Sequence, residues 1–292
     1  MKPFFNKIIV FISVPTGLLI LSFLLLNYYN NKIIESEIDS DIKILFIGDS
    51  HIQKSIDDKL IKAAINISQS SESFYYSYYK LAKILKSNTS ITTIYLGFSH
   101  HSLSSYYDEF VFGKYSKNIS SRYFFILPLT EKLKLLKYNF WILPIYIKEV
   151  YKHGIMNMFK TGNNYSFLGQ YENDFKNVSA VQNSMDKRLL VQFYNDNKLN
   201  NFSESNISYL NKIIDLCNKN KVKLITLNTP LHSYYKSEIP MEYLKKYNEI
   251  IRQDRIVTIN FDELVLDDSC FIPDGDHVSV KGAQLTSNYF NK

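Results

Sequence analysis

A serine, an aspartate and a histidine carry the chemistry that this sequence suggests, and they lie near opposite ends of the chain. Ser50 ends the motif Gly48-Asp49-Ser50 directly after an apolar run, and Asp274 and His277 share a polar loop. A serine hydroxyl becomes a nucleophile when a histidine takes its proton, and a carboxylate holds that histidine in one tautomer. The three residue types together are typical of acyl transfer through a covalent intermediate.

The elements around these residues must bring them together. Apolar runs predict short strands, and amphipathic segments between them predict helices; the runs are 42–47, 65–67, 91–96, 222–227 and 255–261. Strands that alternate with helices favour right-handed crossovers and a parallel sheet, in which every strand-to-helix loop opens at the same edge. We therefore expect one edge of the sheet to collect the residues that follow these strands, which are Ser50, Ser99, Asn228, Asp274 and His277.

The first and last motifs resemble those of a known hydrolase family. Gly48-Asp49-Ser50 with Asp274-x-x-His277 is similar to the first and last blocks of the SGNH (GDSL-type) hydrolases, over residues 41–291. The resemblance implies that Ser50 is the nucleophile, His277 the base and Asp274 the residue that orients it. The fold class expected is a three-layer α/β/α domain with a short, flavodoxin-like parallel sheet of about five strands. A looser similarity is to membrane-anchored SGNH-like proteins of bacterial envelopes, including those that transfer acetyl groups to exopolysaccharides.

The two intermediate blocks of the family differ in this chain. The family usually has a glycine after the second strand, where this chain reads Ile67-Ser68-Gln69-Ser70-Ser71. It usually has Gly-x-Asn-Asp after the third strand, where this chain reads Gly97-Phe98-Ser99-His100. Ser99 thus replaces an asparagine that donates to the oxyanion. We expect the oxyanion to be held by the amides of Ser50 and Gly97 together with Ser99 or Asn228.

An apolar run without a charged residue lies near the N-terminus, from Ile8 to Leu26. As a helix it would span about 28 Å, close to the hydrocarbon thickness of a bilayer. Lys2 and Lys7 precede it, whereas acidic residues dominate the segment after it. This pattern predicts a single-pass anchor with a cytoplasmic N-terminus and an extracytoplasmic catalytic domain. A cleaved signal peptide is the alternative, although no small-x-small cleavage site follows the run.

The chain divides into three expected segments. Residues 1–27 form a cytoplasmic stub and transmembrane anchor, 28–40 a stalk, and 41–292 the SGNH-like domain. Residues 102–202 interrupt the alternation of strands and helices, and we interpret them as an insertion rich in aromatic and aliphatic residues. A lid, an acceptor-binding surface, a membrane-facing patch and extra core-packing helices are all consistent with this composition.

Composition limits the partners. A hydrophobic share of 46% and a charged share of 21% are typical of a globular protein. The net charge of +6 is spread along the chain, so we expect no nucleic-acid partner. Neither the cysteines nor the histidines have metal-type spacing, and we expect no metal or cofactor. Cys217 and Cys270 are either buried thiols or, in an oxidising compartment, a disulfide.

Two functions are consistent with the sequence. The first is a membrane-anchored extracytoplasmic serine esterase or O-acetyltransferase that acts on an acylated envelope polysaccharide or another acylated glycan. Water as the acceptor makes it an esterase, and a sugar hydroxyl makes it a transferase. The second is a catalytically weak or inactive SGNH-fold protein that binds polysaccharide or a partner in envelope assembly. The altered middle blocks and the aromatic-rich insertion favour this alternative.

Overall fold

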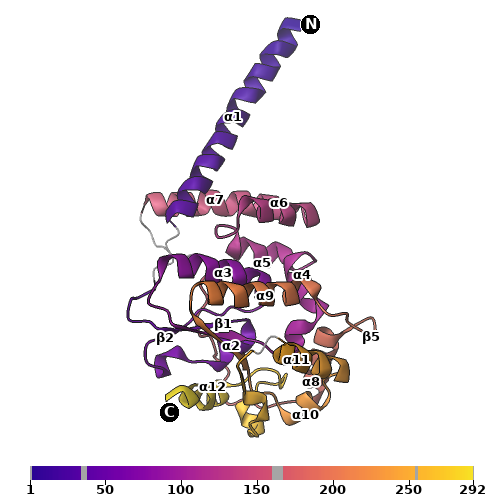
Figure 1. The fold of residues 1–292 in the computed structure, drawn as a ribbon. Coiled ribbons are helices and arrows are strands. Elements are labelled where there is room, and N and C mark those ends of the chain that lie inside the picture. Colours follow the sequence, from indigo (N-terminus) through magenta and orange to yellow (C-terminus); the bar gives the residue numbers. More distant parts are fainter. Residues whose placement is uncertain (1, 34–37, 160–166, 254–255, 292) are drawn as a thin grey trace.

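A computed structural model describes residues 2–33, 38–159, 167–253 and 256–291 (Figure 1). Its main sheet has five parallel strands in the order β2-β1-β3-β6-β7, which are Ala64–Asn66, Ile44–Ile47, Thr93–Gly97, Lys223–Asn228 and Thr258–Asn260. Counted along the chain this is the order 2-1-3-4-5, so the predicted flavodoxin-like sheet is confirmed. The start of the expected strand 255–261 lies outside the described residues, and β7 covers only its middle.

Helices cover both faces of the sheet, as a three-layer fold requires. Leu45 and Ile47 of β1 face α3 (Phe74–Ser87) and α9 (Glu204–Lys219) in the larger core cluster. Phe46 points to the other face, where it packs with Ile52 of α2 (Ser50–Ser55) and Phe290. Figure 1 places α3 and α9 on one side of the sheet and α2 with α12 (Val280–Asn288) on the other. Because both faces are covered, β1 is apolar at consecutive positions rather than alternate ones.

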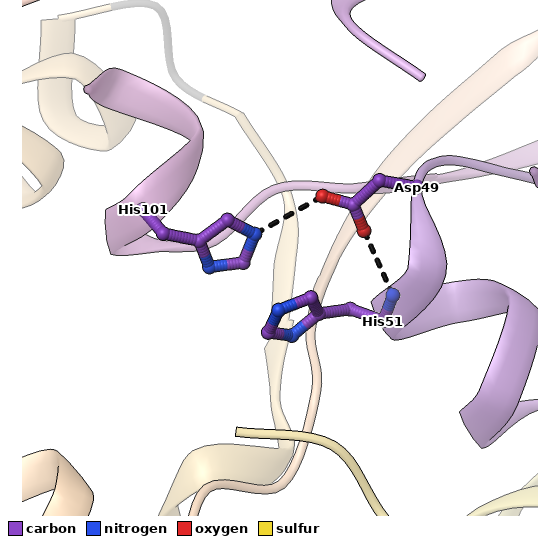
Figure 2. Close-up of side chains that lie close together, drawn as sticks. All are labelled: Asp49, His51 and His101. Carbon is purple, nitrogen blue, oxygen red and sulfur yellow. Dashed lines mark hydrogen bonds and ion pairs between the residues drawn. The ribbon is translucent and has the colours of Figure 1, made fainter. Parts of the chain in front are cut away.

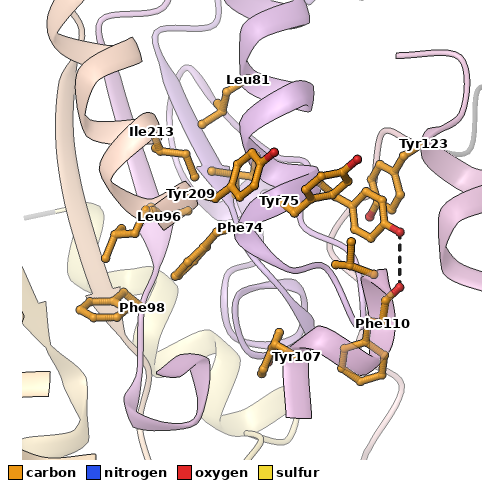
Figure 3. Packing of buried hydrophobic residues seen from close by; sticks show 14 of the residues in the cluster. Phe74, Tyr75, Leu81, Leu96, Phe98, Tyr107, Phe110, Tyr123, Tyr209 and Ile213 are labelled. Carbon is orange, nitrogen blue, oxygen red and sulfur yellow. Dashed lines mark hydrogen bonds between the residues drawn. The ribbon is translucent and has the colours of Figure 1, made fainter. Parts of the chain in front are cut away.

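Residues 102–202 form helices that pack onto the domain. They are α4 (Asp108–Val111), α5 (Ser116–Tyr123), α6 (Leu129–Tyr138), α7 (Ile142–Met158) and α8 (Gln182–Phe193), followed by the hairpin β4 (Tyr194–Asn195) and β5 (Lys198–Leu199). Residues 160–166 lie outside the description. Figure 3 shows Phe110 and Tyr123 of this segment packed near Tyr75 of α3, in the same core cluster. The segment therefore extends the core rather than forming a separate domain.

The remaining elements are short connections and two helices of the second half. The helices are α10 (Ser233–Ser237) and α11 (Met241–Gln253). The 3-10 turns are η1 (Asp58–Leu60), η2 (His100–Leu103), η3 (Ser105–Tyr107), η4 (Phe261–Glu263), η5 (Asp268–Cys270) and η6 (Tyr289–Asn291). Cys217 and Cys270 are both free, buried thiols.

The N-terminal helix α1 (Lys2–Ile33) projects from the domain (Figure 1). Residues Asn6–Lys32 have a mean hydropathy of 2.6, and this is the one helix in the described part of the chain that is long and apolar enough for a membrane. Its length and composition suit a membrane span or a signal sequence. The helix continues past Leu26, and Asn30 in its last turns is buried against α7 and donates to the Val150 carbonyl (2.9 Å). The expected stalk is thus helical up to Ile33, and its residues 34–37 lie outside the description.

Two glycines let α2 lie directly on the sheet. A Cβ at Gly97 would come within 2.5 Å of Ile52 Cγ1, and one at Gly48 within 2.9 Å of the same atom. Ile52 is fully buried, so moving it away from either position would disturb the packing around it. Small residues at both places therefore set how closely the helix that begins with Ser50 approaches β1 and β3.

Gly97→Ala is expected to lower the free energy of unfolding by about 1–3 kcal/mol, because the new methyl group overpacks Ile52. Urea denaturation of the detergent-solubilised full chain, followed by circular dichroism, measures the change. Gly17→Ala is the matched control, since no atom lies within 4 Å of the added methyl group there. Equal stability of the Gly97→Ala variant and wild type would contradict the close-approach role.

Candidate active site

The turn between β1 and α2 places Ser50 at the edge of the sheet. Asp49 caps the helix through its Oδ1, which accepts from the His51 amide (2.9 Å). Ser50 is the first residue of α2, so its own amide lies ahead of the helical hydrogen bonds. Among the described residues, no hydrogen bond occupies that amide. The serine thus offers a hydroxyl and a free backbone donor from one position.

The loop before α12 places Asp274 and His277. Asp274 Oδ1 accepts from the backbone amides of Asp276 and His277 (both 3.1 Å), which fixes the turn. Asp274 Oδ2 is then 2.8 Å from His277 Nδ1, and His277 Nε2 is 2.8 Å from Ser50 Oγ. The structure therefore brings the three residues of the two sequence motifs into one hydrogen-bonded chain.

The order of atoms in this chain fits a nucleophile, base and orienting carboxylate. Burial alone would raise the pKa of Asp274, but the neighbouring His277 lowers it below its usual value. The carboxylate is therefore ionised near neutral pH and accepts the Nδ1 proton, which leaves Nε2 free to accept the serine proton. This arrangement can perform acyl transfer.

A cavity of about 240 Å³ opens beside Ser50. Its walls combine the Ser50, Asp274 and His277 side chains with aromatic, apolar and basic residues and two serines, which are Tyr106, Tyr107, Phe110, Ile272, Lys54, Arg188, Ser70 and Ser71. The volume is below the range of about 300–1,000 Å³ that is usual for ligand pockets. It suits a small acyl group more than a long chain.

The expected oxyanion donors after β3 and β6 do not line this cavity. Gly97 packs beneath Ile52, and the Ser99 amide donates to Ser102 Oγ (3.2 Å) at the start of η2. Asn228 is fully buried at the end of β6, where its side-chain amide has no hydrogen-bonding partner in the described part of the chain. Of the four expected donors, the structure places only Ser50 at the cavity.

Ser71 lines the cavity, in contrast to the oxyanion donors that were expected after β3 and β6. Its φ of +65° is in the left-handed region that favours glycine. The amides of its neighbours are used, since Ser70 donates to Gln53 Oε1 (2.9 Å) and Glu72 to the Gln69 carbonyl (3.1 Å). Within the described residues, no hydrogen bond occupies the Ser71 amide. The chain thus keeps a glycine-like backbone conformation in the segment where the SGNH family usually has glycine.

A second set of charged residues lies behind the first. Asp276 is fully buried, and its Oδ2 accepts from Arg188 Nε (2.6 Å) and Gln192 Nε2 (2.8 Å). His51 Nε2 lies 3.1 Å from the same oxygen, and His51 Nδ1 lies 3.1 Å from Thr229 Oγ1. Burial alone would raise the pKa of Asp276, but His51 and Arg188 hold it well below its usual value. Asp276 therefore joins α2, α8 and the loop before α12.

Figure 2 shows the other half of this buried set, which is Asp49, His51 and His101. Asp49 Oδ2 is 3.1 Å from His101 Nε2 and also accepts from the Tyr107 hydroxyl. The rings of His51 and His101 stack with centroids 3.9 Å apart. Burial lowers the pKa of both imidazoles, but Asp276 and Asp49 raise that of His51 above its usual value, whereas that of His101 stays lowered. These opposite pKa shifts disfavour a positive charge on both stacked rings at the same time.

The donor atoms of these residues are close enough to raise the question of a metal ion. Those of Asp49, His51 and His101 lie within 4.8 Å of one another, as do those of His51, Asp276 and His277. Each carboxylate, however, already accepts from a histidine or a guanidinium, and Arg188 places a fixed positive charge at Asp276. The residues present fit buried ion pairs better than a cation site.

Sequence reasoning missed most of this second set. Neither His51 nor His101 belongs to the residues that the two motifs single out. The sequence could have indicated Asp276, because this residue lies inside the motif that contains Asp274 and His277. No sequence pattern indicates Arg188, since it belongs to the segment 102–202, whose contacts depend on tertiary packing.

Comparisons with known proteins add only distant structural similarities. No protein-family model and no curated protein sequence matches the chain. A candidate acylhydrolase from Bacteroides fragilis has 9% identity and a TM-score of 0.39, covering 89% of this chain and 90% of its own. A candidate platelet activating factor from Streptococcus pneumonia has 12% identity and a TM-score of 0.42, with 97% of each chain covered. A GDSL-like lipase from Bacteroides thetaiotaomicron has 8% identity and a TM-score of 0.37, with 92% and 95% covered.

At this level of similarity, the function must be argued from the chain's own geometry. Ser50 begins the helix α2 after β1, and Asp274 and His277 lie in the loop before the last α-helix, α12. With the strand order described above, this is the arrangement of nucleophile, base and orienting carboxylate that the two motifs predict.

Asp276→Asn is expected to destabilise the protein by about 3–5 kcal/mol near neutral pH, because it leaves Arg188 and His51 without their buried counter-ion. The pKa of Asp276 is lowered in the fold, so its contribution is present above the unfolded pKa of about 3.9 and is lost as the pH falls through the folded pKa. The stability gap between wild type and variant should therefore narrow on acidification.

Urea-unfolding midpoints of the detergent-solubilised full chain, taken from about pH 7 to pH 3, measure this gap. Asp267→Asn is the control, since that carboxylate is 84% exposed. A gap that stays constant with pH would show that Asp276 is not an ionised partner in the fold.

Proposed function

We propose that this protein is a membrane-anchored, extracytoplasmic serine esterase or O-acyltransferase that acts on an acylated envelope glycan. The observation that carries the proposal is the hydrogen-bonded chain from Ser50 through His277 to Asp274, which borders a cavity. This geometry supplies a nucleophile, a base and a carboxylate that orients the base. The alternative, a catalytically weak binding protein, makes no use of it.

The first half of the reaction forms an acyl-enzyme. Ser50 Oγ attacks the acyl carbonyl carbon while its proton passes to His277 Nε2. The resulting oxyanion accepts from the free amides of Ser50 and Ser71, which replace the donors expected after β3 and β6. The ester carbon–oxygen bond then breaks, and His277 returns the proton to the departing alcohol oxygen. The Asp274 carboxylate stabilises the imidazolium throughout.

The second half transfers the acyl group to an acceptor. An acceptor hydroxyl loses its proton to His277 Nε2, its oxygen attacks the acyl carbon, and Ser50 recovers its proton as the acyl–serine bond breaks. Water as the acceptor releases a carboxylic acid, and a sugar hydroxyl gives a new ester. The residues around the site serve both outcomes equally.

Two features support an acylated glycan of the envelope as the substrate. The cavity is small, which suits an acetyl or similar acyl group, and Tyr106, Tyr107 and Phe110 give it aromatic walls against which a sugar ring can pack. The long apolar run of α1 and the lysines ahead of that run support an anchor that keeps the domain on the outer side of the membrane. An anchored enzyme would then act on material at the envelope.

A fluorophosphonate probe tests the proposed nucleophile. The detergent-solubilised full chain should be labelled, and Ser50→Ala should abolish labelling because the attacking oxygen is gone. His277→Ala should slow labelling by at least about 100-fold, which is the lower range for loss of a general base. In-gel fluorescence over time measures both rates.

Ser121→Ala is the matched control, because Ser121 does not line the cavity and its hydroxyl donates to the Asn118 carbonyl. It should be labelled at the wild-type rate. Absence of labelling in wild type, or labelling that persists in Ser50→Ala, would exclude the enzyme and favour the binding protein.

A further inference from the structure

We propose that α6 and α7 lie flat in the headgroup region of the bilayer that α1 crosses, and that the domain is seated on the membrane through them. The inference rests on the anchoring included in the proposed function and adds a second membrane contact to it. Figure 1 shows α6 and α7 as a layer of their own, on the side of the domain from which α1 projects.

The outer side of this layer is apolar and unusually exposed. We call it the α6–α7 face and define it by six large side chains that are 53–74% exposed, which are Leu129, Leu133, Phe140, Trp141, Ile155 and Phe159. Apolar surface of this kind, gathered on one side of neighbouring helices, marks an interaction site more often than a free surface. Phe140 and Trp141 lie between the two helices, where an aromatic pair can enter the interface.

The inner side of the same layer packs on the domain. Ile142, Tyr146, Val150 and His153 of α7 are buried at helical spacing, and Tyr146 stacks on Phe124 with ring centroids 4.3 Å apart. The buried side of α7 therefore packs on the domain. The exposed apolar side is the one that faces a different partner.

Contacts between α1 and α7 determine how deep the layer of α6 and α7 lies in the bilayer. Tyr151 on α7 donates to the Leu19 carbonyl (3.0 Å) and lies 2.7 Å from Ser22 Oγ. The apolar run of α1 ends at Leu26, so the contacts at Leu19 and Ser22 both fall within about the last two turns of that run. If α1 crosses a bilayer, α7 must touch it near the outer end of the span, close to the boundary between the acyl chains and the headgroups.

Particular residues of α1 and α7 allow these two helices to approach each other closely. A Cβ at Gly154 would lie 2.7 Å from Leu26 Cδ2, so the glycine leaves room for the Leu26 side chain of α1 to pack on α7. Tyr146 also donates to Asn27 Oδ1 (2.5 Å), and Phe23 meets the Tyr146 ring edge-on. These contacts fix α7 against the end of α1 rather than leaving it free to move away from the membrane.

The charges of the layer fit a lipid surface. Residues 129–159 contain five lysines and two glutamates, which gives a basic excess. Lys148 and Lys152 are exposed among the apolar side chains, and lysine stems can lie along acyl chains while the ammonium groups reach the phosphates. A basic, aromatic and aliphatic helix surface is typical of interfacial segments, whose apolar side enters the headgroup boundary by about 5–10 Å. An interface with another protein subunit would not require this combination of basic, aromatic and aliphatic side chains.

Trp141 makes the proposal directly testable, because it is the single tryptophan of the chain. The full-length protein is reconstituted into vesicles of phosphatidylcholine and phosphatidylglycerol that carry bromine either near the headgroup end of the acyl chains or near the bilayer centre. Trp141 emission should be blue-shifted and quenched more strongly by the shallow bromines than by the deep ones.

Two relocated tryptophans provide the controls in a Trp141→Phe background. Leu18→Trp lies in the middle of α1 and should be quenched most by the deep bromines, whereas Val265→Trp, on a residue that is 98% exposed, should not be quenched. Quenching at position 18 without quenching of Trp141 would overturn this inference and leave the anchor intact. A blue-shifted but unquenched Trp141 would indicate a protein partner or a second copy and would overturn it equally. Absence of quenching at position 18 would show instead that the proposed anchor itself is wrong.

Discussion

The buried Asp276 carboxylate is the interaction on which the arrangement of the site depends. It joins His51 next to the nucleophile, Arg188 on the inserted helix α8 and the loop that carries His277. A buried ion pair contributes little net stability relative to apolar packing, but removal of one partner is costly because the other charge stays buried. The contacts of Asp276 therefore hold three segments that are distant in the sequence in one arrangement, in which His277 can reach Ser50.

The same principle explains the pairing of charges around the nucleophile turn. Asp49 caps α2, accepts from Tyr107 and faces His101, while His51 faces Asp276 from the other side of the stacked rings. Each carboxylate is held ionised by a cation or by hydrogen-bond donors, and the pKa values of the two imidazoles are shifted in opposite directions. The apolar strands determine where Ser50 lies, and this polar set holds the helix that begins with Ser50 in a fixed position. Residues in the 102–202 segment thus contribute to the site through Tyr107 and Arg188 as well as to the core.

Much of the fold could be predicted because its signals are local. Short apolar runs mark the strands, and Ser50, Asp274 and His277 lie beside recognisable turns. The oxyanion donors could not be predicted in this way, because a position after a strand does not define where an amide points. Ser99 begins a 3-10 turn and uses its amide there, whereas Ser71 has a positive φ that its residue type does not reveal. Arg188 depends on the packing of α8, which the sequence pattern of 102–202 leaves open.

The central claim is that Ser50 forms a covalent acyl-enzyme with His277 as its base. Brief incubation of the full chain with 4-nitrophenyl acetate, acid quenching and peptide mass spectrometry test it most directly. The account predicts one added acetyl group on the peptide that contains Ser50, and its loss in His277→Ala. Acetylation at other residues only, or equal acetylation of Ser50 in His277→Ala, would contradict it.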